Sequence, residues 1–212
     1  MKDAGRPPSA SDDASSWAES RYHRLFATMA NGAVYQDAEG AIIDANPAAE
    51  RLLGMTVDQM KGISSLDPRW RAVHEDFAPF PGEEHPAMVA LRTGKAVYDV
   101  VMGVFRPSDG RYVWLLVSAQ PEFEGHDDTP SGVFATFIDI TDRKRIESEL
   151  RRRRELEELL ADVATSYIHL PPDRLDDAIQ DTMDRLGEYI GADRFYVFSY
   201  DWDAYTTSNS HE

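Results

Sequence analysis

The sequence predicts an α+β fold in which an antiparallel sheet with flanking helices is followed by a long helix. Residues 111–120 alternate between two sets of side chains, which is the two-residue period of a strand. The Pro107–Gly110 segment before them has the composition of a hairpin turn. Beyond Thr141, apolar residues recur at spacings of three and four, which indicates a helix over residues 142–169.

Composition and charge narrow the class of protein. The chain has 212 residues, of which 42% are hydrophobic and 10% aromatic, enough to form a core. The absence of cysteine excludes disulfides, zinc–thiolate sites and thiol nucleophiles, and the net charge of −16 disfavours non-specific nucleic-acid binding. No run of about 18 apolar residues could span a bilayer, and the N-terminus lacks the apolar stretch of a signal peptide. We expect a disordered leader at residues 1–16, no nucleic-acid partner and a cytoplasmic location.

The N-terminal part predicts two strands between two helices. Residues 17–30 carry an apolar helical stripe, and short strands follow at residues 33–36 and 41–44. The Asp37–Gly40 segment between the strands is a tight turn whose glycine can adopt a positive φ. Asn46 is a good N-cap, and the proline after it suits the first turn of the next helix.

A segment rich in proline and aromatic residues precedes the remaining strands. Residues 63–86 are predicted to be irregular, and a helix at 86–93 begins with proline and is followed by glycine. Strands at 96–105, 111–120 and 132–140 then complete an antiparallel sheet of five strands.

The helix at 142–169 leaves two interpretations open. Its apolar stripe is narrow, and four arginines at 151–154 interrupt it. It is either a coiled-coil connector between two copies of the chain, with a stutter, or an ordinary amphipathic helix. A second helix at 173–190 and two strands, at 194–200 and 205–211, are predicted to follow.

Three short motifs resemble those of PAS sensory domains. The Asp44–Ala49 stretch, DANPAA, is similar to the family's turn from the second strand into a helix. The Asp109–Trp114 stretch, DGRYVW, resembles a hairpin of the family's sheet, and Asp139–Lys144, DITDRK, resembles the motif that closes the last strand and starts the signalling helix. The resemblance implies a PAS fold over residues 17–140 and a helical connector over residues 141–170.

The end of the chain resembles a second kind of sensory domain. Residues 155–212 are similar to the first third of a GAF domain, through the stretch that begins at Gly191. This implies an incomplete GAF-like α/β segment at residues 171–212. Proteins of this arrangement typically continue into a histidine kinase or a diguanylate cyclase. The chain itself contains no phospho-acceptor histidine box, no ATP-binding glycine motif and no GGDEF-like sequence, so we expect no enzyme activity of its own.

The PAS resemblance also implies where a ligand and a signal would be handled. The inner face of the sheet and the helix at 86–93 would line a ligand pocket with Met88, Leu91, Trp114, Leu116, Ser118, Ala135 and Phe137. A core filled by side chains, without a ligand, is the alternative. Asp139 sits where the sheet ends, and Thr141 is placed to cap the outgoing helix with its hydroxyl. We expect these two residues to transmit a change from sheet to helix, although a purely structural cap fits the same pattern.

The sequence assigns no cofactor. Haem needs an axial ligand, yet residues 87–93 contain no histidine, and His85 is expected to point away from the pocket. A flavin–cysteinyl photosensor is excluded by the lack of cysteine. Side chains of the types that ligate divalent metals are His74, Asp76, Glu83, Glu84 and His85. Their spacing matches no metal motif, so we expect a solvated acidic loop and no metal.

Two functions therefore compete. The first is a sensory and signal-transduction module that senses a small ligand, or relays a signal, and acts on downstream domains through the connector helix. The second is a dimerisation scaffold with no ligand of its own. Both predict a homodimer formed through the N-terminal helix, the connector helix or both. A retained ligand or a sizeable pocket would separate them.

Overall fold

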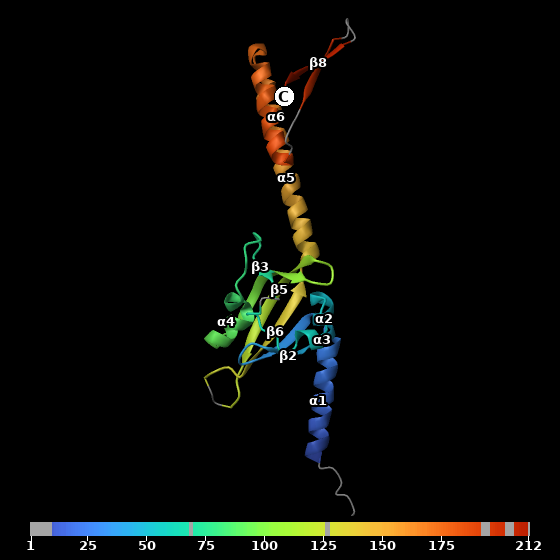
Figure 1. Ribbon diagram of the computed structural model, residues 1–212, viewed down its shortest axis with the longest axis vertical. Helices are drawn as coiled ribbons and strands as arrows, with labels where there is room; N and C mark the ends of the chain where they lie inside the picture. Colours follow the sequence, from blue (N-terminus) through green and yellow to red (C-terminus); the bar gives the residue numbers. More distant parts are fainter. Residues whose placement is uncertain (1–9, 68–69, 126–127, 192–195, 202–205, 212) are drawn as a thin grey trace, which may run out of the picture. The chain divides into compact units, whose positions relative to one another are not determined.

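The computed structural model describes residues 10–67, 70–125, 128–191, 196–201 and 206–211 (Figure 1). The chain divides into two compact units, with the boundary between Lys144 and Arg145. Nearly all the buried hydrophobic side chains of the described residues belong to the first unit, and Met183 is the exception. The first unit therefore holds the main core.

The first unit is built on an antiparallel sheet of six strands in the spatial order β2-β1-β6-β5-β4-β3. The strands are β1 (Gly32–Asp37), β2 (Ile42–Ala45), β3 (Ala72–Val73), β4 (Val97–Arg106), β5 (Arg111–Glu122) and β6 (Gly132–Asp139). The prediction of five strands was wrong, because β3 lies in the segment predicted to be irregular. It pairs only two residues with β4, which is too short for an alternating pattern to show in the sequence.

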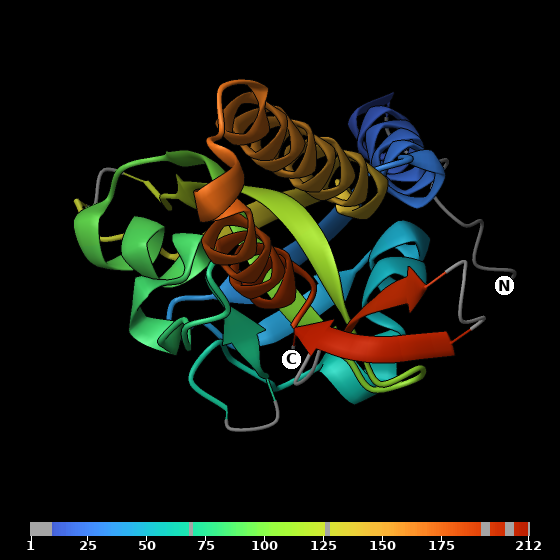
Figure 2. The ribbon, with the colours of Figure 1, turned by 90° about the horizontal axis from the view of Figure 1, so that it is seen from above.

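Short helices lie beside this sheet (Figures 1 and 2). They are α2 (Pro47–Leu53), α3 (Val57–Met60), the 3₁₀ turn η1 (Gly82–Glu84) and α4 (Pro86–Thr93), and α1 (Ala10–Thr28) precedes the sheet. Residues 10–16 are thus helical and not the disordered leader that was predicted, while residues 1–9 lie outside the described residues. Alanine and the acidic Asp12 and Asp13 favour a helix start at this point.

Hydrogen bonds cap the starts of α2 and α3, and the cap of α2 was predicted. Asn46 precedes α2, and its Oδ1 accepts a hydrogen bond from the Ala49 backbone N–H at 2.8 Å. Thr56 precedes α3, and its hydroxyl accepts from the Gln59 backbone N–H at 3.3 Å. The Gln59 side chain accepts in return from the Thr56 backbone N–H at 2.9 Å, which completes a capping box.

Asn46 also joins three elements of the first unit. Its side chain is buried, and its Oδ1 accepts a second hydrogen bond, from the Ala33 backbone N–H at 3.0 Å. Its Nδ2 donates to the backbone carbonyls of Phe26, at 3.2 Å, and of Asn31, at 2.9 Å. One side chain therefore holds together the end of α1, the start of β1 and the start of α2.

The second unit consists of two helices and a hairpin. Its elements are the greater part of α5 (Thr141–Ile168), the 3₁₀ turn η2 (Pro172–Arg174), α6 (Leu175–Ile190), β7 (Val197–Asp201) and β8 (Thr206–His211). The two helices begin and end close to their predicted limits, and β7 and β8 pair as an antiparallel hairpin. Residues 194, 195 and 205 of the predicted strands lie outside the described residues.

Hydrogen bonds join α5 to α6. The Tyr167 hydroxyl lies 3.1 Å from the Thr182 hydroxyl, and the Tyr189 hydroxyl donates to the backbone carbonyl of Arg152 at 2.7 Å. None of the side chains of α5 is buried. Within the described ranges, no helix has the length and apolar character needed to cross a membrane.

Candidate functional site

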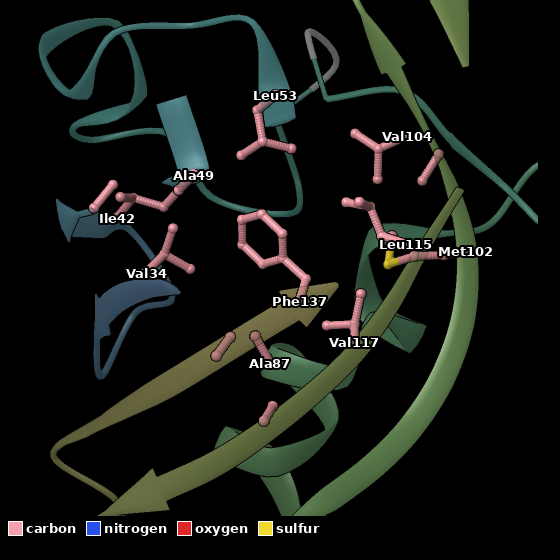
Figure 3. Close-up of a cluster of buried hydrophobic side chains, with 14 of the residues drawn as sticks. Val34, Ile42, Ala49, Leu53, Ala87, Met102, Val104, Leu115, Val117 and Phe137 are labelled. Carbon is pink, nitrogen blue, oxygen red and sulfur yellow. The ribbon is translucent and has the colours of Figure 1, made fainter. Parts of the chain in front are cut away.

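A small cavity lies between the inner face of the sheet and the elements that cover it. Its volume is about 60 Å³. Figure 3 shows apolar side chains turned toward one another in this region, with the ring of Phe137 among them. The lining includes Ile42, Leu53, Met102, Leu115, Val117 and Phe137. In such an apolar wall, a few polar groups decide how a small molecule is oriented.

Gln36 is one of these polar groups. It follows Val34 by two residues on β1, so both side chains face the core and line the cavity. The Gln36 side chain is 5% exposed, and its Oε1 has no hydrogen-bond partner among the described residues. An unpartnered buried polar group costs about 1–3 kcal/mol. A bound molecule that donated a hydrogen bond to Oε1 would offset that cost.

His85 is another polar group of the cavity lining, which also includes Ser64 and Ser65. It is 3% exposed, and its Nε2 lies 3.1 Å from the Phe80 carbonyl oxygen. Because a carbonyl only accepts, Nε2 carries the proton in this contact. Burial lowers the pKa of His85, against the opposing effect of the hydrogen bond to Phe80, so the imidazole is neutral at pH 7.

The expectation that His85 points away from the pocket was wrong. His85 occupies the N-cap position of α4, where its backbone is extended and Pro86 fixes the first helical turn. In that conformation its ring lies edge to face against the Phe80 ring, with 5.1 Å between the ring centroids. The histidine is therefore part of the wall and not of the solvent-facing loop.

Four of the predicted pocket residues lie on α4 and β6. Ala135 and Phe137, on β6, line the cavity as predicted. Met88 and Leu91 do not: a Cβ built at Gly40, in the β1–β2 turn, would lie 2.6 Å from Met88 Sδ and 3.6 Å from Leu91 Cδ1. The α4 helix turns Ala87 toward the cavity, together with the proline that begins it. The helix was predicted correctly, but the face that it presents to the cavity was not.

The other three predicted residues lie on the opposite face of the sheet. Trp114, Leu116 and Ser118 are half-buried on the outer face of β5. Leu115 and Val117 line the cavity in their place. The prediction failed because both sets of side chains are apolar near the middle of the strand, and an error of one residue exchanges the two faces.

Ser118 has a structural role on the outer face. Its hydroxyl accepts a hydrogen bond at 3.1 Å from the backbone N–H of Asp99, which has a φ of 56° at an irregularity in the β4–β5 pairing. One feature of the sequence could have revealed the correct face, since Ser118 and Gln120 are polar and share the outer face. In the structure, Ala119 lies on the inner face and pairs with Ala135 of β6.

The central strand β5 is bonded directly to the start of α5. The Trp114 backbone N–H donates to the Thr141 hydroxyl at 2.9 Å, and the Trp114 carbonyl accepts from the Ile140 N–H at 2.8 Å. Asp139 Oδ1 accepts from the Thr141 backbone N–H at 2.8 Å. The Thr141 hydroxyl therefore binds the sheet, and the prediction that it caps the helix was wrong. The Asp139 carboxylate instead accepts from the first backbone N–H of the helix. Both residues lie at the junction; transmission through them stays a prediction.

The loop that carries Phe80 also reaches this junction. Phe77, with a φ of 64°, places its ring 5.5 Å from the Trp114 ring in an edge-to-face contact. Glu75 forms an ion pair with Lys144 in the first turn of α5. The loop thus contacts the wall of the cavity at one end and the outgoing helix at the other.

Gln36 and His85 were missed by the sequence analysis. Gln36 could have been found from β1, because a polar residue two positions after an inward-facing valine points inward as well. His85 carried no comparable signal, because the side-chain direction of an N-cap residue depends on the loop before it. Among the described residues, no group of three or more His, Cys, Asp or Glu side chains is arranged to hold a metal ion.

A protein-family model described as a PAS domain matches residues 30–142, more than half of the chain. The chain belongs to the PAS domain family. The matched residues run from just after α1 to the first turn of α5, so they contain the sheet, the cavity and the junction. The match ends before the second unit, and the GAF-like interpretation of residues 171–212 stays a prediction.

The chain is similar to several solved structures at low sequence identity. A PAS domain from Colwellia psychrerythraea is 21% identical, with a TM-score of 0.46 over 59% of this chain and 98% of that chain. An RNA-binding light-oxygen-voltage receptor is 20% identical, with a TM-score of 0.53 over 73% of this chain and 42% of that chain. A domain of a sensory box sensor histidine kinase/response regulator from Geobacter sulfurreducens is 19% identical, with a TM-score of 0.44 over 58% of this chain and 96% of that chain. A comparison with curated protein sequences found no match.

Proposed function

We propose that this chain is the sensory part of a multidomain signalling protein, in which the PAS domain responds to occupancy of its cavity and passes the change to α5. The observation that carries the proposal is the position of β5. It lines the cavity with Leu115 and Val117, and through Trp114 it is hydrogen-bonded to Ile140 and Thr141. One strand is thus in contact with both the sensing site and the outgoing helix.

The mechanism follows from close packing. A molecule that enters or leaves a dense core displaces the side chains around it, because there is little free volume to absorb the change. A displacement of β5 moves both backbone groups of Trp114 that hold the start of α5. The helix then changes its rotation or register, and downstream domains receive that change.

The proposal includes a homodimer formed through α1, α5 or both. Trp17 and Leu25 are exposed on α1, and Ile146 and Leu150 are exposed on α5. A second copy of the chain would cover such apolar side chains by presenting the same surface in return. In this arrangement, α5 leads to a GAF-like segment and to the kinase or cyclase output of a larger protein.

The competing function is a scaffold that pairs subunits and binds no ligand. The observation in its favour is the size of the cavity, since about 60 Å³ can be closed by small movements of its lining. Native mass spectrometry of freshly purified protein, with an absorbance scan, is the first test. A dimer that carries a stoichiometric adduct supports the sensor, and a dimer without one favours the scaffold.

A cavity-filling variant tests the relay without knowledge of the ligand. Ala135→Val adds two carbon atoms in the cavity lining and imitates occupancy. We expect hydrogen–deuterium exchange of the α5 amides to change by at least twofold, because the added volume displaces β5. Unchanged exchange in α5, with the dimer intact, would favour the scaffold.

A second variant tests the junction. Thr141→Val keeps the shape of the side chain but removes the oxygen that accepts from the Trp114 N–H. We expect Ala135→Val to lose most of its effect on α5 exchange in this background. Thr136→Val is the matched control, because Thr136 is half-buried on the outer face of β6 and away from α5. If both threonine variants preserve the response, the relay does not pass through Thr141.

A further inference from the structure

Resting on the proposed sensory function, we propose that the cavity recognises a small, neutral, largely apolar molecule that donates a hydrogen bond to Gln36 Oε1. The inference specifies the chemical class of ligand for a site that the family assignment leaves open. It follows from the polarity, the charge and the size of the cavity.

The polarity of the wall requires a donor on the ligand. Gln36 Oε1 is buried, lines the cavity and lacks a hydrogen-bond partner in the described part of the chain. At His85, Nε2–H is already engaged by the Phe80 carbonyl, so the neutral ring has only an acceptor nitrogen left over. Ser64 and Ser65 also line the cavity, and their hydroxyls can donate or accept. A ligand that carries an N–H or O–H group therefore satisfies Gln36 Oε1, and a molecule with acceptors alone leaves that oxygen unpaired.

The charge of the wall requires a neutral ligand. Among the described residues, those that line the cavity include no Asp, Glu, Lys or Arg. An ion that entered this site would lose its hydration without gaining a counter-charge, which is far more costly than the transfer of a neutral molecule. Carboxylates, phosphates and ammonium ions are therefore excluded as ligands of this cavity.

The volume limits the size of the ligand. A cavity of about 150 Å³ accommodates benzene, and this cavity holds about 60 Å³. The ligand that fits without rearrangement has roughly two or three non-hydrogen atoms, by proportion to benzene. A haem or a flavin would need a different core.

Ethanol and dimethyl ether provide a matched pair of probes. Both are neutral molecules of the same formula with three non-hydrogen atoms, but only ethanol has an O–H donor. Each is titrated into the full 212-residue chain and followed by NMR of the labelled methyl groups of Leu115 and Val117. We expect the methyl signals of both residues to shift, and ethanol to bind about tenfold more tightly than dimethyl ether, because one hydrogen bond to a buried acceptor is worth about 1.4 kcal/mol.

Gln36→Leu tests the role of the amide oxygen. We expect this variant to bind dimethyl ether as well as the unchanged protein does and to lose the tenfold preference for ethanol. Gln120→Leu is the matched control, because it makes the same substitution at an exposed position of the outer face, and it should keep the preference. If Gln36→Leu does not fold, the ratio of the two dissociation constants in the unchanged protein is the deciding measurement.

The outcomes distinguish this inference from the sensory proposal. Equal binding of ethanol and dimethyl ether to the unchanged protein overturns donor recognition, yet leaves a ligand cavity for the sensor. Binding of neither probe means that the cavity holds water only, and this also overturns the inference. If ethanol is preferred as expected but Ala135→Val leaves hydrogen–deuterium exchange in α5 unchanged, donor recognition stands and the sensory proposal fails.

Discussion

The two faces of β5 carry similar apolar side chains in different surroundings. Leu115, on the inner face, is 2% exposed and lines the cavity. Its neighbour Leu116 is half-buried on the outer face, where it lies across from Val101 and Ile138 of the adjacent strands. The pleat of the strand sends neighbouring residues to opposite faces. Identical side chains one position apart therefore differ in their contribution to stability and in their access to the site.

The largest expected effect compares the two leucines directly. Leu115→Ala should lower the free energy of unfolding by about 3 kcal/mol, because it opens a void in a packed core. Leu116→Ala removes the same atoms from a half-exposed position and should cost about 1 kcal/mol. Urea unfolding of both variants measures the difference. Equal costs would mean that the two faces are not distinct in solution.

Substitutions at two small residues test the same difference between the inner and outer faces of β5. Ala119→Ser places a hydroxyl on the inner face, where Ala119 is completely buried, and should cost about 2 kcal/mol. Ser118→Ala removes the acceptor for the Asp99 N–H on the outer face and should cost about 1 kcal/mol. Urea unfolding of the two variants shows which one loses more stability. If Ser118→Ala lowers the free energy of unfolding more than Ala119→Ser does, the hydrogen bond at the β4 irregularity matters more for stability than the apolar inner face.

The smallest effect at neutral pH concerns His85. Burial lowers the pKa of His85 in the folded protein below its ordinary value of 6.5, with nearby Glu83 opposing this shift and His74 adding to it. Near pH 7 the imidazole is neutral in both states, so its contribution to the pH dependence is small. As the pH falls through 6.5, the unfolded chain takes up a proton that the folded protein does not, and stability should decrease.

His85→Gln checks this assignment. Glutamine can still donate to the Phe80 carbonyl but does not titrate, so the loss of stability between pH 7 and pH 5 should become less steep. His74→Gln is the matched control, because His74 stacks on the other side of the same loop, with 4.0 Å between its ring centroid and that of Phe80. If His74→Gln, and not His85→Gln, reduces the loss of stability between pH 7 and pH 5, His85 is not the group responsible.

The sequence predicted helix ends and turns well, because these depend on residues within a few positions of each other. The α4 helix was placed at residues 86–93 because proline starts it and Gly94 follows it, and the structure has the same limits. The Asp37–Gly40 turn was predicted from its composition, and Gly40 has a φ of 82°. Caps, turns and periodicity act within a few residues, so they can be read along the chain.

The candidate site was predicted less well because its geometry is not local. The inner face of β5, the rotation of α4 and the direction of His85 all depend on what packs against them. Trp114 and Thr141 illustrate the same point, since their hydrogen bond joins residues 27 positions apart. The sequence placed Thr141 at the start of α5, but only the fold identified its partner.

The sequence by itself determined the PAS family, the order of the elements other than β3 and the start of α5, because these depend on motifs and short-range periodicity. The tertiary structure alone decided which face of β5 lines the cavity, which groups of α4 and its N-cap reach it, and that the Gln36 oxygen is left without a partner. The physical reason is that a pleated strand offers two faces of nearly equal hydrophobicity, and only packing against the other elements selects one of them.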